Sequence, residues 1–162
     1  MNMSKWLMIA AVAAAMPAVA SAQGLPTQKV LTIDVAQTIA QEAMASCRAS
    51  GYKVTVTVVD GANVLKAFLR DDGAPAITVE IGRLKANTAM AFGRPSGPPA
   101  NAQPGQPLPP PILPSMTNAA GGVPIKVGDD LIGAVSVSGA PGGDKDAACV
   151  NAALAKVADK LK

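Results

Sequence analysis

The sequence contains no histidine among its 162 residues. This absence excludes Ser-His-Asp and Cys-His nucleophilic sites, and it excludes every histidine-ligated metal centre. Most catalytic zinc sites are excluded with them, and the two cysteines alone would make a poor structural zinc site. Chemistry at this protein must therefore use carboxylates, lysine, hydroxyls, backbone amides, methionine or a bound cofactor.

Aromatic residues are scarce too, with one Trp, one Tyr and two Phe. Basic residues exceed acidic ones by only three, and they are scattered along the chain. Proteins that bind nucleic acid need a concentrated basic surface, and those that hold single strands also use aromatic side chains for stacking. We therefore expect no nucleic-acid partner.

The N-terminal segment has the pattern of a secretory signal peptide. Lys5 precedes the apolar run of residues 6–16, and Ala20-Ser21-Ala22 fits an A-x-A cleavage site. The run is too short to span a membrane, and no stop-transfer pattern follows it. We predict a signal peptide over residues 1–22 and an exported chain, periplasmic or secreted, with no membrane span after cleavage at Gln23.

Export gives the two cysteines two possible states. In an oxidising compartment Cys47 and Cys149 are candidates for one disulfide. Such a bond would close a loop of about 100 residues and contribute about 4–5 kcal/mol in the chain-entropy account. The alternative is two separate buried thiols, since cysteine is among the most buried residue types.

The apolar pattern predicts a single α+β domain over residues 23–162. We expect one antiparallel sheet made of two hairpins, with helices packed over it. Strict alternation over residues 53–59 indicates a half-buried strand. The expected helices run from a Thr32 cap to Gly51, over 75–92, and from an Asp144 cap to 161; the expected strands are 53–59, 64–69, 123–127 and 131–138.

Residues 94–114 differ in composition from the rest, because nine of these 21 residues are proline. Polyproline II and coil are the structures that such a segment favours. This proline-rich insert is either a variable surface loop or a docking arm for a partner or a neighbouring subunit.

Several short motifs, in this order and spacing, resemble the haem-binding HbpS / GlcG family, which also occurs as the C-terminal domain of PduO-type proteins. The resemblance covers residues 31–161. Its marks are VVD at 58–60, Phe68, Arg70, DGA at 72–74, KANTA at 85–89, FGRP at 92–95, GGVPI at 121–125, IGAV at 132–135 and VSGA at 137–140.

The resemblance implies a profilin-like fold, a homo-oligomer that is often an octamer, and haem as the leading small-molecule ligand. The chain departs from the family at several points; at the opening of the last helix, Gly143-Asp144-Lys145-Asp146 stands where the family often has Gln-Asp-Glu. The double glycine of the first turn is replaced by Ala62-Asn63, and the proline-rich insert replaces a segment that is often helical. Without histidine, an axial ligand to haem iron would have to come from Tyr52, a methionine such as Met90 or Met116, a lysine, a cysteine or a hydroxyl, or be absent.

The resemblance places a ligand pocket on the second helix. There Thr88 would present its hydroxyl to a planar ligand, Lys85 would meet a propionate, and Phe92 would lie beside them. Lys85 and Thr88 are neighbours on a helix surface at i, i+3 spacing. The alternative for Thr88 is a buried hydroxyl that bonds back to the carbonyl of Leu84.

Two further sets of residues are candidates for ligand binding. Arg70 and Asp72 flank a tight loop where Arg70 could recognise an anion beside the open backbone of Gly73, or could form a structural pair with the acid. Gly121 and Gly122 could let a ligand approach the backbone, or could form a bulge or turn. We assign no catalytic residue and no metal site.

These observations favour an exported protein that binds a small ligand, with haem first. One alternative is an accessory protein or weak enzyme for a 2-hydroxy acid of the glycolate type, whose carboxylate Arg70 and Lys85 would hold. A second is an interaction protein that works through its proline-rich arm. Whether the chain is an enzyme is left open, with binding favoured over catalysis.

Overall fold

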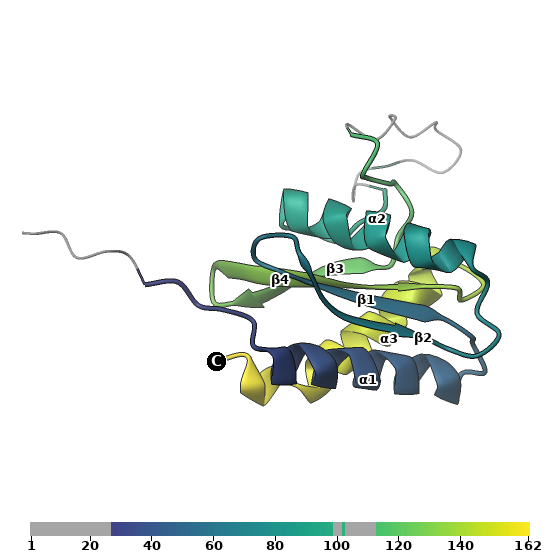
Figure 1. Ribbon diagram of the computed structural model, residues 1–162, viewed down its shortest axis with the longest axis horizontal. Helices are drawn as coiled ribbons and strands as arrows, with labels where there is room; N and C mark the ends of the chain where they lie inside the picture. Colours follow the sequence, from purple (N-terminus) through teal and green to yellow (C-terminus); the bar gives the residue numbers. More distant parts are fainter. Residues whose placement is uncertain (1–26, 99–101, 103–112) are drawn as a thin grey trace, which may run out of the picture.

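A computed structural model describes residues 27–98, 102 and 113–162. This part of the chain forms one antiparallel four-stranded sheet in the order β2-β1-β4-β3, with α2 on one face and α1 and α3 on the other (Figure 1). The predicted α+β architecture is confirmed, whereas the predicted signal peptide and most of the insert lie outside the described residues. The elements are α1 (Ile33–Ala49), β1 (Thr55–Asp60), β2 (Leu65–Arg70), α2 (Ile77–Phe92), β3 (Gly122–Val127), β4 (Asp130–Ser138), α3 (Gly143–Lys156) and the short 3-10 helix η1 (Ala158–Lys160).

The central strand β1 is buried on both faces, so the prediction of a half-buried strand was wrong. Thr55 and Thr57, expected to face solvent, are 0% and 1% exposed. The cause is α2, which covers their side of the sheet; the hydroxyl of Thr55 lies 2.7 Å from that of Thr78 on this helix. In β1, Val56 and Val58 therefore face the apolar core under α1 and α3, and the threonines face α2; both sides of the strand are buried.

The two faces of the sheet differ in chemistry. The face under α1 and α3 belongs to a large apolar cluster. Beneath α2 the contacts are small and polar: the Ser136 hydroxyl donates to the carbonyl of Gly82 over 2.6 Å. A Cβ atom at Gly82 would lie 3.0 Å from the Thr57 hydroxyl, so glycine lets α2 pack closely on the sheet. The apolar cluster on this side is small and consists of Val59, Ala86, Ala89 and Ala134, with Met90 packed against it.

The helix ends agree in part with the sequence. Thr32 caps α1 as predicted, accepting a hydrogen bond from the N–H of Val35. The predicted cap at Asp144 was wrong, because α3 follows Gly142 and has no side-chain cap. Asp146 instead reaches back and accepts from the N–H of Ala140 over 2.9 Å. The last helix ends at Lys156, short of the predicted end at 161.

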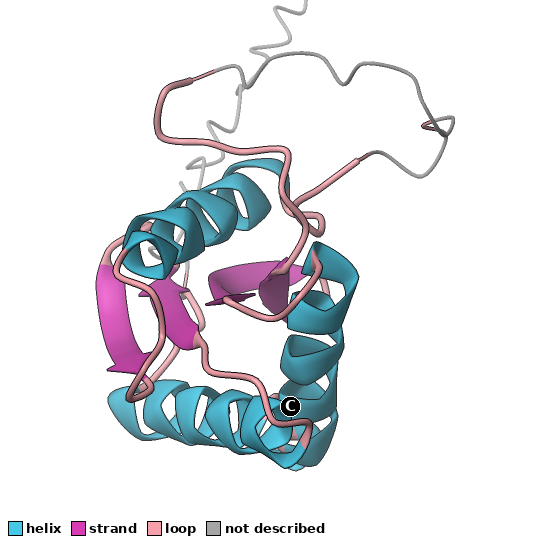
Figure 2. Ribbon diagram, turned by 90° about the vertical axis from the view of Figure 1, so that its right-hand side faces the viewer, coloured by secondary structure: helices cyan, strands magenta, loops and turns pink. Residues whose placement is uncertain are grey.

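The helices α1 and α3 pack against each other on the same side of the sheet (Figure 2). Cys47 of α1 and Cys149 of α3 form a disulfide, with their Cα atoms 5.4 Å apart. The disulfide prediction is confirmed, and both cysteines are buried. Across residues 27–98 and 113–162, no helix has the length and apolar character needed to cross a membrane.

Candidate functional site

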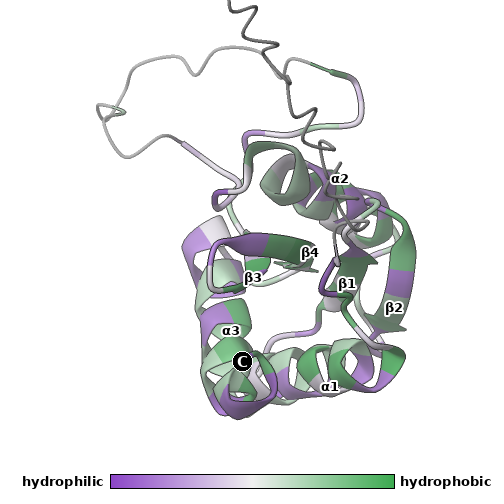
Figure 3. Cartoon of the chain, turned by 90° about the vertical axis from the view of Figure 1, so that its left-hand side faces the viewer, coloured by the Kyte–Doolittle hydropathy of each residue, from purple (hydrophilic) through white to green (hydrophobic). Residues whose placement is uncertain are grey.

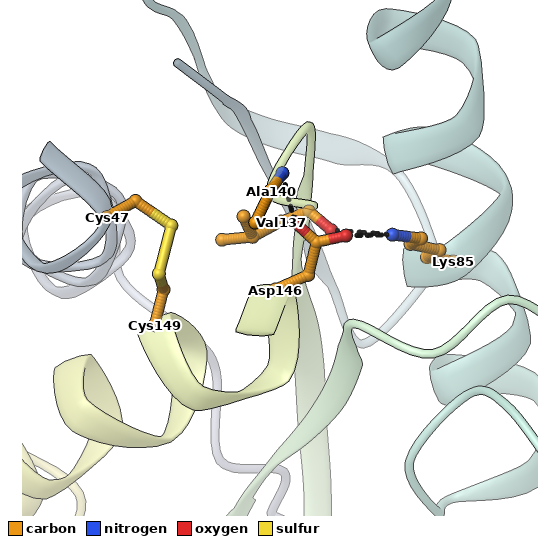
Figure 4. The surroundings of a disulfide bond; sticks show 6 residues. All are labelled: Cys47, Lys85, Val137, Ala140, Asp146 and Cys149. Atoms are coloured by element: carbon orange, nitrogen blue, oxygen red, sulfur yellow. Dashed lines mark hydrogen bonds and ion pairs between the residues drawn. A yellow bond between two sulfur atoms is a disulfide. The ribbon is translucent and has the colours of Figure 1, made fainter. Parts of the chain in front are cut away.

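Lys85 is buried where α2, α3 and the end of β4 meet, with 3% of its surface exposed. Its Nζ atom donates to the carbonyl of Val137 over 3.1 Å and to the carboxylate of Asp146 over 2.5 Å (Figure 4). The second oxygen of Asp146 accepts from the N–H of Ala140. This one ion pair therefore joins three elements inside the fold.

Burial raises the pKa of the Asp146 carboxyl, because removal from water disfavours its charged form. The hydrogen bond and the positive charge of Lys85 act in the opposite direction, as does the N–H of Ala140. Nearby Asp144 adds a smaller rise. The charge on Asp146 thus depends on Lys85, so the two side chains form a single structural unit.

The glycine pair before β3 makes room for this ion pair. Gly121 has a φ of 122°, and a Cβ atom there would lie 2.7 Å from the carbonyl oxygen of Val137 and 3.0 Å from Nζ of Lys85. A Cβ atom at Gly122 would collide with the Lys85 carbonyl. The structure thus brings Lys85, Gly121 and Gly122 together, and other atoms of the chain fill the space that side chains at the two glycines would need.

Thr88 lies one turn beyond Lys85, and its hydroxyl is used within the chain. It donates to the carbonyl of Leu84 over 2.8 Å and accepts from the N–H of Thr117 over 2.9 Å. The bond to Leu84 is the alternative that the sequence left open. Neighbouring Asn87 donates to the carbonyl of Ser115, so this face of α2 holds the segment that leads into β3.

Arg70 lies at the end of β2, and its guanidinium donates twice to the carbonyl of Ala74, over 3.0 and 2.6 Å. It therefore stabilises the loop through the backbone, whereas Asp72 is exposed. The buried acid of this loop is Asp71, which accepts hydrogen bonds of 3.1 and 2.9 Å from Arg48. This pair was not predicted from the sequence, because no local pattern connects residues on separate elements.

Arg48 also sets the protonation of Asp71. Its hydrogen bonds lower the pKa of the Asp71 carboxyl, a change that burial opposes and that the charges of Arg48 and Lys53 reinforce. The same hydrogen bonds raise the pKa of Arg48. The pair holds the end of α1 against the β2–α2 loop.

The exposed member of the predicted site on α2 is Phe92, with 41% of its surface accessible. The guanidinium of Arg94 lies over its ring, 5.0 Å from the centroid. At 1.5 Å per residue, Phe92 is about 22 Å along α2 from Ile77, near which Arg70 and Asp72 lie. The predicted residues thus divide into an interior group around Lys85 and two separate surface positions.

One sequence signal could have identified Lys85 as buried. It shares a helix face with Thr78, Gly82 and Ala89, all small and all buried. A lysine on such a face needs an acidic partner inside the fold. The sequence does not tell which acid, since Asp146 lies 61 residues further along the chain.

No group of three or more His, Cys, Asp or Glu side chains within the described residues could hold a metal ion. Met90 and Met116, the thioethers considered as iron ligands, are each half-buried. Met90 packs against the small apolar cluster under α2.

The model of one protein family, described as haem degrading protein HbpS-like, matches residues 31–155. This range includes the whole sheet, α1, α2 and the ion pair between Lys85 and Asp146. The chain belongs to the HbpS-like family. No curated protein sequence matches it.

Solved structures resemble this HbpS-like chain over most of its length. A double mutant of HbpS from Streptomyces reticuli is 27% identical, with a TM-score of 0.71, and the match covers 89% of this chain and 98% of that one. Protein ORFY of Klebsiella pneumoniae is 26% identical, with a TM-score of 0.71 and coverages of 83% and 96%. A third similar structure, a PduOC:heme complex, is 21% identical, with a TM-score of 0.69 and coverages of 78% and 94%, and shares the fold.

Proposed function

We propose that this HbpS-like chain is an exported protein that binds haem or a related tetrapyrrole at the C-terminal end of α2. The family match over residues 31–155 supports the ligand class. The signal-peptide pattern of residues 1–22 supports export. The proposed position of the haem site rests on one observation: the ring of Phe92 is exposed and the guanidinium of Arg94 lies over it.

The residues at this end of α2 match the two chemical parts of haem. An exposed aromatic ring can stack on the apolar macrocycle, and a guanidinium can pair with a propionate. Leu131 adds apolar surface, since a Cβ atom at Gly93 would lie 3.9 Å from its side chain. Because the sequence contains no histidine, we expect the affinity to come from these contacts rather than from an imidazole ligand to iron.

The test is a titration of the mature chain with hemin, followed by its Soret band. We expect saturable binding, and we expect Phe92→Ala to weaken it about three- to tenfold. Arg94→Gln should weaken it several-fold. Phe68→Ala is the matched control, because Phe68 is 39% exposed but lies on β2, and it should bind hemin normally.

Iron-free protoporphyrin IX separates stacking from iron ligation. It should bind about as tightly as hemin, because the proposed contacts are to the macrocycle and its carboxylates. A strong preference for hemin would indicate an iron ligand and move attention to Met90 or Met116. The proposal would be abandoned if micromolar hemin gave no saturable Soret change.

The 2-hydroxy acid alternative has weaker support. Lys85, one of its two cations, is 3% exposed and is paired with Asp146. Arg70, the other, donates to the carbonyl of Ala74. A thermal shift with glycolate that disappears in Arg70→Gln would revive this alternative.

We also propose that the protein is a homo-oligomer, in line with the family resemblance. Light scattering on the mature chain measures its mass directly. Deletion of residues 98–111 tests whether the proline-rich insert takes part. Unchanged oligomer mass and unchanged partner binding would count against the interaction-arm alternative.

A further inference from the structure

The strand β2 has a free edge. In the described part of the chain β2 pairs with β1 alone, at one end of the sheet (Figure 3). The N–H of Asp71 donates to the carbonyl of Val54. This bond shows which residue pairs between β1 and β2 are hydrogen-bonded and which are not. Because bonded and non-bonded pairs alternate, the backbone N–H and C=O groups of Phe68 and Arg70 point away from β1. Such an edge is a template for another strand.

A groove runs beside this edge. Two cavities, of about 320 and 230 Å³, lie between α1 and β2, and both are lined by Gln41 and Leu69. Ala40 and Met44 of α1 form the bottom of the groove and are 1% and 5% exposed, and Gln37 and Gln41 add polar groups to its walls. A side chain from a strand added to β2 would enter this groove, since alternate residues of a strand face the same side.

Three basic residues lie along the rim of the groove. Lys66 lies at one end, and Arg48 and Arg70 lie at the other. Arg48 is paired with Asp71, and Lys66 is 3.8 Å from Asp60. Arg70 forms no ion pair with a carboxylate of the described residues, since its guanidinium donates to the Ala74 carbonyl. Of these three cations, Arg70 is therefore the one that an outside carboxylate could pair with. Its side chain lies on the α2 side of β2, as does that of Thr55 opposite it.

We propose that this groove binds an extended acidic peptide of another protein, which adds to β2 as a fifth strand. Its backbone pairs with Phe68 and Arg70, one set of its side chains enters the groove beside α1, and the alternate, acidic set faces Arg70 on the other side of the sheet. This is the strand-addition mode of peptide recognition, in which the backbone gives affinity and pockets for alternate side chains give specificity. The proposal does not depend on haem binding.

Two other occupants fit less well. A second copy paired antiparallel through β2 about Phe68 would bring Lys66 of one chain opposite Arg70 of the other, and like charges placed opposite each other are destabilising. The chain's own residues 94–114 include nine prolines, which lack the N–H that a ladder requires. Charge and hydrogen-bonding capacity therefore both favour an acidic peptide with little proline.

The probe is a fluorescein-labelled peptide of about eight residues in which valine and glutamate alternate. Its binding to the full mature chain, followed by anisotropy, should be saturable and should weaken as salt is added. Two N-methylated versions test strand addition on the unaltered protein. Methylation of the amides on one edge should abolish binding, and methylation of the other edge should leave it intact.

Charge variants test the rim. Lys66→Gln with Arg70→Gln should weaken binding about three- to tenfold at low salt. The control is Lys126→Gln, an exposed lysine on β3 at the opposite edge of the sheet, which should bind normally. Hydrogen exchange should slow at the amides of Phe68 and Arg70 when the peptide binds.

Four outcomes would overturn the proposal. They are absence of saturable binding, equal binding of both methylated peptides, equal binding of a polyproline peptide of the same length, and a dimer through β2 that the acidic peptide does not dissociate. The last of these would assign the edge to a second copy of the chain.

Discussion

The ammonium group of Lys85 lies 2.5 Å from the carboxylate of Asp146, and each side chain is only 4% exposed. The pair joins α2 to the first turn of α3 across the end of β4. It also explains why the preceding segment has glycine at 121, where a side chain would meet the pair.

Removing one member of this pair should be costly. Lys85→Met leaves Asp146 buried without its cation and should lower the free energy of unfolding by about 3–5 kcal/mol. The double variant Lys85→Met with Asp146→Leu should recover most of this, to within about 1–2 kcal/mol of the parent. Urea denaturation measures both, with Lys126→Met as an exposed control.

The pH dependence of the Lys85→Met variant should identify the cause. Without Lys85 the pKa of Asp146 rises further, since the hydrogen bond and charge that lowered it are gone. A folded-state pKa above the unfolded value adds stability at low pH and loses it as pH rises through the folded value. Lys85→Met should therefore approach the parent's stability in acid; an equal deficit at every pH would contradict the buried-charge explanation.

Asp71 should give the opposite pH dependence. Hydrogen bonding to Arg48 lowers the pKa of its carboxyl below the ordinary 3.8. The resulting stability is present above that value and is lost as pH falls through the lowered one. Asp71→Asn should reduce this loss of stability in acid, as followed by urea midpoints across acidic pH. Asp72→Asn, at an exposed neighbouring position, is the control.

Gly121 should tolerate alanine poorly. The cost combines its φ of 122° with a Cβ atom 2.7 Å from the carbonyl oxygen of Val137. We expect a loss of about 2–5 kcal/mol. Gly128→Ala separates the two causes, because Gly128 has a φ of 62° but open space around it, and it should cost about 1–2 kcal/mol. Equal losses at both positions would show that the contacts with Val137 and Asp146 are unimportant.

Reduction of the bond between Cys47 and Cys149 should lower stability by about 4–5 kcal/mol, because the loop of 102 residues gains freedom in the unfolded chain. Urea curves with and without reductant measure this change, and mass before and after reduction confirms the bond. Recovery of two free thiols from intact exported protein would contradict it.

The sequence predicted those features whose signals are local. The Thr32 cap, the two hairpins and the helix that ends before Gly93 follow from neighbouring residues. Burial of Thr55 could not be predicted, because it depends on α2 covering a face whose residues look solvent-compatible. The pairs of Lys85 with Asp146 and of Arg48 with Asp71 depend on packing between elements, which spacing along the chain does not encode.

The disulfide has a consequence for the covalent topology of the protein. Along the sequence, Cys47 precedes and Cys149 follows all four strands, α2 and the proline-rich insert. A protease that cuts once anywhere between them leaves two polypeptides that remain one molecule until a reductant separates them. For a protein proposed to work outside the cell, cleavage of one peptide bond in the insert would therefore leave both fragments covalently joined through the disulfide.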